Sequence, residues 1–244
     1  MAEENKKGLN TNSNSYTIIY SIIIVILVAF LLAFVFQALK PMQDANVALD
    51  KKKQILNSLN IRDLNNEEAA AKYQEVVLAD EIIDEQGNVL EKGEQGGENY
   101  GFKLNSADFK NGKLALFVCK VDGQTKYVIP VYGMGLWGAI NGYIAINADK
   151  STVFGTYFDH ESETAGLGAE IKDNRAWQNQ FQGKKLFAQD PHKIALAVSK
   201  KVEDPSTQVD GITGATLTSN GVTEMLQTCL GAYMNCLLYT SPSP

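Results

Sequence analysis

Histidine and cysteine are scarce in this chain of 244 residues, which has two of the first and three of the second. So few ligands leave little for a zinc or iron–sulfur site built from protein side chains. A basic excess is also absent, because the formal net charge is −6, and this excludes the electrostatic footprint of a nucleic-acid-binding domain. The apolar share of 45% and the charged share of 20% are ordinary for a globular protein. A disordered or collagen-like chain is therefore excluded.

Charged residues are missing altogether between Gly8 and Leu39. Residues 16–39 are long enough to cross a hydrocarbon core of ~30 Å at about 1.5 Å per residue. A cleaved signal peptide has a shorter apolar region, about 7–15 residues, followed by a small-x-small site that is missing here. A buried helix of a soluble protein is the alternative, but such helices rarely lack a polar face for this long. The sequence predicts a tail at 1–15 and one transmembrane anchor at 16–39.

The pattern of residue types changes twice after the anchor. Residues 40–80 mix charges with helix-forming residues and predict a juxtamembrane helical segment, in which Asn65 or Asn66 can cap a helix that opens with two glutamates. Residues 81–238 alternate short apolar runs with turn residues and predict the folded domain. Residues 239–244 end in Ser-Pro-Ser-Pro and predict an irregular tail.

Two hairpins are predicted within the folded domain. The runs 114–121 and 125–132 flank an Asp-Gly pair, the turn sequence that favours a two-residue hairpin loop. The runs 143–146 and 152–158 flank a second turn. Antiparallel pairs joined by short turns, with helices at both ends of the domain, indicate an α+β fold: an antiparallel sheet flanked by helices, after a single transmembrane helix.

A last helix is predicted from one continuous apolar face at helical spacing. Its N-cap is expected at Thr218 or Ser219. The face consists of Val222, Met225, Leu226, Cys229, Leu230, Tyr233, Cys236 and Leu237. Cys229 and Cys236 lie two turns apart, ~10 Å, which is too far for a disulfide, so apolar packing is expected for the cysteines.

The stretch Gly133–Gly138 matches the pattern G-x-G-x-x-G. A dinucleotide site of this kind needs a helix directly after the glycines, whereas the residues that follow here have the texture of a strand. Two interpretations remain open: a connection between hairpins with Trp137 in the core, or a flexible loop that borders a flat ligand.

Two further stretches carry candidate chemistry. His160–Gly168 has glycines at 166 and 168 that allow close approach of a ligand, beside the polar side chains of Glu161, Glu163 and Thr164. The segment 210–219 has small residues before the last predicted helix and four hydroxyls, from Thr213, Thr216, Thr218 and Ser219. Free N–H groups and the helix dipole favour a phosphate there. A Ser/Thr-rich capping segment with no ligand is the alternative.

The second stretch carries a resemblance to a known family. The signature D-x-x-[S/T]-G-A-T is filled in order by Asp210, Thr213, Gly214, Ala215 and Thr216. In this signature and in its N-terminal anchor, the chain resembles the NqrC family. Members of that family are a flavoprotein component of the sodium-translocating NADH:quinone oxidoreductase, a bacterial inner-membrane complex. In that family a flavin transferase attaches FMN to the final threonine. The resemblance therefore implies a phosphoester of FMN at Thr216, with the rest of the signature around it.

Two more segments share the resemblance. The family loop H-x-E-T-P-G-L-G lies near the flavin ring, and it implies ring contacts from Glu163, Thr164, Gly166, Leu167 and Gly168. Ala165 stands where proline is usual, and one extra residue separates His160 from Glu163. Gly-Leu-Trp at 135–137 resembles the same family, and it makes Trp137 a further candidate for the ring slot.

The resemblance implies an electron carrier in a complex that couples the transfer of electrons from NADH to quinone with the export of Na⁺. As one component of that complex, the chain is expected to be inactive alone. It is expected to have no catalytic residue and no metal of its own. Expected partners are the other subunits, the flavin transferase and the lipid bilayer, and no nucleic acid. Two alternatives stay open: the corresponding flavoprotein of the related Rnf complex, RnfG, which shares the threonine signature, and a cofactor-free anchored binding module.

Two arguments give opposite predictions for the side of the membrane on which the domain lies. More lysines follow the anchor than precede it, which favours a cytoplasmic C-terminal side. The flavin transferase of the family acts outside the cytoplasm, which implies a periplasmic domain. We expect the periplasmic side, because large domains translocate largely regardless of flanking charge.

Overall fold

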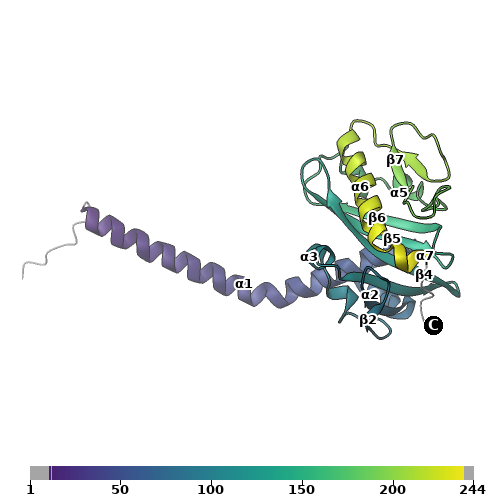
Figure 1. Cartoon of the computed structure of the whole chain (residues 1–244). Coiled ribbons are helices and arrows are strands. Elements are labelled where there is room, and N and C mark those ends of the chain that lie inside the picture. Colours follow the sequence, from purple (N-terminus) through teal and green to yellow (C-terminus); the bar gives the residue numbers. More distant parts are fainter. Residues whose placement is uncertain (1–10, 12, 239–244) are drawn as a thin grey trace, which may run out of the picture. The chain divides into compact units, whose positions relative to one another are not determined.

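The computed structural model describes residue 11 and residues 13–238, which form two compact units that divide after Ala48. The first unit is the main part of helix α1, Asn14–Ser58, which contains Pro41 (Figure 1). The most apolar window of α1 has a mean hydropathy of 3.2 and no buried residue, so α1 has the length and composition of a membrane span. The predicted anchor and the predicted juxtamembrane helix are thus one continuous helix.

The second unit is built on a six-stranded sheet whose neighbouring strands are all antiparallel, in the order β2-β1-β3-β4-β5-β6. Two further strands, β7 and β8, form a small parallel pair. The strands are β1 Val77–Ile83, β2 Val89–Lys92, β3 Leu114–Val121, β4 Gln124–Met134, β5 Ala139–Asn147, β6 Val153–His160, β7 Ala197–Ser199 and β8 Gln208–Asp210. The expected α+β class is confirmed.

Short helices precede and follow the strands, and one long helix covers the sheet. They are α2 Asn66–Val76, the 3₁₀ turn η1 Gly101–Lys103, α3 Ser106–Lys110, α4 Glu170–Asp173, α5 Arg175–Asn179, α6 Thr216–Ala232 and α7 Met234–Leu238. Both predicted hairpins are present, as β3–β4 and β5–β6. Asp122 and Gly123 have φ values of 49° and 76°, which the type I′ turn requires.

The start of the domain differs from the expected residue 81. Asn65 caps α2 in a reciprocal capping box with Glu68, and β1 follows at once from Val77. Leu49 to the end of α2 belongs to the same compact unit as the sheet. The physical reason is burial, since this stretch places six apolar side chains in the core: Ile55, Leu56, Leu59, Ala69, Tyr73 and Val76.

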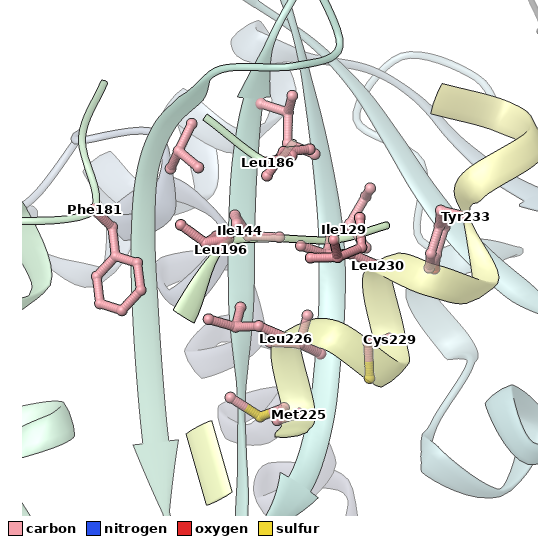
Figure 2. Close-up of a cluster of buried hydrophobic side chains, with 14 of the residues drawn as sticks. Ile129, Ile144, Phe181, Leu186, Leu196, Met225, Leu226, Cys229, Leu230 and Tyr233 are labelled. Carbon is pink, nitrogen blue, oxygen red and sulfur yellow. The ribbon is translucent and has the colours of Figure 1, made fainter. Parts of the chain in front are cut away.

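The main core lies between the sheet and α6. Figure 2 shows Met225, Leu226 and Leu230 of α6 directed toward the strands that carry Ile129 and Ile144. The predicted apolar face is therefore confirmed, and all three cysteines are buried, with no disulfide between them. The helix is interrupted at Tyr233, whose backbone leaves the helical conformation and whose hydroxyl donates to the carbonyl of Ala115 at 2.6 Å. α7 then continues the buried face with Cys236 and Leu237.

Candidate functional site

The signature segment connects β8 to α6. Its first residue, Asp210, is fixed through its backbone: Trp177 Nε1–H donates to its carbonyl at 2.7 Å, and its own N–H donates to Gln180 Oε1 at 3.0 Å. The N–H of Gly211 donates to the carbonyl of Ser199 at 2.8 Å, across the β7–β8 pair. The Asp210 carboxyl is left exposed to solvent. The turn that leads to α6 therefore begins at a backbone that several hydrogen bonds hold in place.

Thr216 is the first residue of α6 and is exposed. The N-cap is Ala215, which is buried, and no side chain caps the helix. The expectation of a cap at Thr218 or Ser219 is therefore wrong. Both residues are buried in the first turn, where the Thr218 hydroxyl donates to a carboxylate and Ser219 Oγ accepts from the N–H of Ile212 at 3.1 Å.

The N-terminus of α6 opens into a groove of about 380 Å³. The groove is lined by Val198, Lys200, Gly211, Ile212, Thr213, Gly214, Thr216, Ser219 and Asn220. First-turn N–H groups have no partner within a helix, and the dipole of a 17-residue helix adds positive potential at this end. Lys200 brings a further positive charge to the same groove. An anion at Thr216 can accept hydrogen bonds from the first-turn N–H groups and can balance the charge of Lys200. The residues present therefore fit a phosphate.

Lys200 was not found from the sequence. It lies in the segment after β7, and the parallel pairing of β7 with β8 brings it to the groove. In the sequence it is one lysine of a Lys-Lys pair, and no local signal distinguishes it from its neighbour Lys201.

Gly214 is the one position of the signature where backbone conformation demands glycine. Its φ is 79°, a region that other residues rarely adopt. A Cβ atom there would also lie 2.8 Å from Leu167 Cδ2. The His160–Gly168 loop therefore lies directly against the signature, and the close approach depends on the missing side chain of Gly214.

Glu163 connects three predicted segments. The backbone N–H of Trp137 donates to its Oε1 at 2.8 Å, and the hydroxyl of Thr218 donates to its Oε2 at 2.6 Å. Its own N–H donates to His160 Nδ1 at 3.2 Å. Burial favours a raised pKa of Glu163, but the hydrogen bonds from Thr218 and from the backbone N–H groups of Trp137 and Gly138 outweigh it, and the pKa is lowered. The side chain is an ionised carboxylate at neutral pH.

The three segments that meet at Glu163 carry exposed apolar side chains. Trp137 is 67% exposed, Leu167 42% and Leu217 60%. The interpretation that Trp137 lies in the core is therefore wrong, because its loop leaves the sheet between β4 and β5. Thr164 and Gly166 are exposed on the same loop as Leu167. Exposed aromatic and aliphatic side chains near the groove at the N-terminus of α6, which fits a phosphate, suit a ligand with a flat ring and an anionic end.

Gly168, the last residue of this loop, is not exposed with the others. It is buried, with its Cα against the Glu163–Thr218 contact, where a Cβ would lie 2.2 Å from Glu163 Oε2. Among the described residues, no group of three His, Cys, Asp or Glu side chains is placed to hold a metal ion.

Comparison with known proteins gives a consistent set of matches. Residues 135–231 match the family model described as FMN-binding domain. The NqrC component of the Na(+)-translocating NADH-quinone reductase of Haemophilus ducreyi is 34% identical over 199 residues, which cover 75% of this chain and 77% of that protein. The crystal structure of the same component from Parabacteroides distasonis has a TM-score of 0.75 and 37% identity, and the match covers 83% of this chain and 98% of that one. The structure of Shewanella oneidensis NqrC, at 24% identity and a TM-score of 0.65, shares the fold; that match covers 79% of this chain and 97% of the other.

Proposed function

The chain belongs to the NqrC family of the Na(+)-translocating NADH-quinone reductase, and from this premise we propose that it is the covalent-FMN electron carrier of that membrane complex. FMN is attached through its phosphate to the hydroxyl of Thr216. One observation carries this proposal: Thr216 presents an exposed hydroxyl at the uncapped N-terminus of α6, in the groove shared with Lys200.

The chemistry of the site follows from its parts. A phosphodiester at Thr216 keeps one negative charge, which the dipole of α6 and the ammonium of Lys200 stabilise. Bound flavin supplies the electron uptake and release. The chain itself contributes a tether that prevents loss of the cofactor, and an apolar bed from Trp137, Leu167 and Leu217 that limits the access of water. Electron transfer through such a carrier needs no acid or base from the protein.

The remaining residues of the site have positioning roles in this proposal. Gly214 and Ala215 bring the backbone close to the phosphate, with Thr213 and Asp210 on the exposed side of the turn, where the flavin transferase has access. Thr164, Gly166 and Leu167 border the ring, with Gly168 and Glu163 packed beneath them.

The place of the protein in the cell follows from α1 and from the family. α1 anchors the chain once in the bacterial inner membrane, the other subunits of the complex are its partners, and its electron transfer contributes to Na⁺ export. The flavin-bearing domain lies in the periplasm. Protease added to intact spheroplasts should remove the domain after residue 48, and protection of the domain would contradict this side of the membrane.

In-gel flavin fluorescence after denaturing electrophoresis tests the attachment, with the chain produced together with a flavin transferase. A covalent flavin survives denaturation, so the native chain should fluoresce. Thr216→Ala should abolish the signal, whereas Thr213→Ala, three residues earlier in the same groove, should only weaken it. Equal fluorescence from Thr216→Ala and the native chain would place the attachment elsewhere, and a dark native chain would leave a cofactor-free module.

A further inference from the structure

We propose that Glu163 is a positioning residue that fixes the aromatic loop at 134–138 to the N-terminal turn of α6 and places one negative charge beneath the flavin ring. The inference rests on the proposed function, because the ring is located by the attachment at Thr216. It differs from a direct contact of the Glu163 side chain with the cofactor.

The first support is that both carboxylate oxygens are already used within the protein. Oε1 accepts from the Trp137 N–H at 2.8 Å and Oε2 from the Thr218 hydroxyl at 2.6 Å. These donors come from segments far apart in the sequence, and Thr218 is close to Thr216 in the first turn of α6. Only 8% of Glu163 is exposed. The carboxylate therefore connects the loop of Trp137 to the first turn of α6.

The second support is that the surroundings hold the carboxylate in one place. A Cβ at Gly135 would lie 2.5 Å from Oε1, and a Cβ at Gly168 would lie 2.2 Å from Oε2. Glycine at both positions lets two backbone segments close over the carboxylate, and any larger residue would displace it. The backbone N–H of Glu163 is itself bonded to His160 Nδ1 at 3.2 Å. The side chain is thus held from several directions.

The third support is charge. The donors from Trp137 and Thr218 are neutral groups, so they stabilise the carboxylate without cancelling its charge. The side chains of Trp137, Leu167 and Leu217 are exposed on the three segments that meet at Glu163, and a ring bound on them would be within the field of a partly buried anion. Charges act more strongly where water is excluded. A fixed negative charge opposes the addition of electrons to the ring and lowers its midpoint potential.

Three variants separate position from charge. Glu163→Gln removes the charge, but its amide keeps one oxygen for the Trp137 N–H and offers an N–H to the Thr218 hydroxyl. Glu163→Ala removes both the charge and the two hydrogen bonds. Glu161→Gln is the matched control, because it removes an exposed carboxylate two residues away on the same loop.

Two measurements read the two effects. The midpoint potential of the flavin-loaded full-length protein should rise in Glu163→Gln and in Glu163→Ala, and stay unchanged in Glu161→Gln. Hydrogen exchange of the 134–138 backbone, measured on flavin-free protein, should be about tenfold faster in Glu163→Ala, because a hydrogen bond to a charged group is lost. Glu163→Gln should retain most of the protection.

The outcomes distinguish this inference from the proposed function. An unchanged potential in Glu163→Gln overturns the electrostatic part, and unchanged exchange in Glu163→Ala overturns the positioning part. A native chain that takes up no flavin would refute the proposed function, and it would overturn the potential-setting role with it. The exchange comparison needs no flavin and would still decide whether Glu163 holds the loop.

Discussion

Replacement of Thr218 by valine tests the physics of the site most sharply, since valine has nearly the same shape and lacks the hydroxyl. The change leaves Oε2 of Glu163 without its donor at 2.6 Å. Hydrogen bonds to charged groups stabilise proteins by about 1.5–3 kcal/mol. Because Thr218 and Glu163 are both buried, at 1% and 8% exposure, we expect a loss of about 2 kcal/mol in the free energy of unfolding. For a chain of this size that lowers Tm by roughly 4–8 °C.

The pH dependence of this loss has a defined sign. The hydrogen bond from Thr218 helps to lower the pKa of Glu163 in the folded protein. A carboxyl with a lowered folded pKa contributes stability above its unfolded pKa, about 4.3, and loses it as the pH falls further. The difference between Thr218→Val and the native protein should therefore be full at pH 7 and should shrink below about pH 4.

Thermal unfolding of the detergent-solubilised full-length chain, followed by tryptophan fluorescence, measures both effects. Thr218→Ser is the matched control, because it keeps the hydroxyl and loses only a methyl group. It should remain within about 1 kcal/mol of the native protein. The reasoning is refuted if Thr218→Val is as stable as Thr218→Ser, or if the difference between Thr218→Val and the native protein is the same at pH 7 and about pH 3.

Three further predictions concern other parts of the domain. Leu226→Ala opens a cavity in the core under α6, where Leu226 is fully buried, and should lower the free energy of unfolding by about 2–5 kcal/mol in chemical denaturation. Burial lowers the pKa of Lys51 to about 8, so the unfolded chain binds more protons between about pH 8 and 10. Stability measured in urea should gain a rising contribution over that range, and Lys51→Met should remove it. Lys200→Ala should slow flavin attachment about two- to fivefold, as expected for ~0.5–1 kcal/mol of electrostatic attraction, whereas Lys201→Ala should match the native rate.

Local sequence signals predicted most of the individual elements. The Asp-Gly pair at 122–123 identified the β3–β4 hairpin because only a few residue types adopt two consecutive positive φ values. The Asn65 cap and the apolar face of α6 were equally readable, since capping and helical periodicity act within a few residues. These features depend on neighbours in the sequence, which a single chain displays.

Features decided by distant contacts were not predictable in this way. The end of α6 at Tyr233 accompanies a hydrogen bond to Ala115 in β3, and nothing near Tyr233 in the sequence indicates it. The true start of α6 was missed because hydroxyl residues suggest caps, whereas Thr218 is used by Glu163 instead. The resemblance identified the segments of the site, but which residues face solvent and which face each other depends on how three segments meet.

Mass spectrometry of the peptide Asp204–Glu224 tests the central claim most directly. The chain is produced together with a flavin transferase and digested after glutamate, which releases one peptide that contains the whole signature. The proposal predicts a mass increase equal to FMN less one water, with fragment ions that place it on Thr216 rather than on Thr213 or Thr218. An unmodified peptide, or a flavin on another residue, would contradict it.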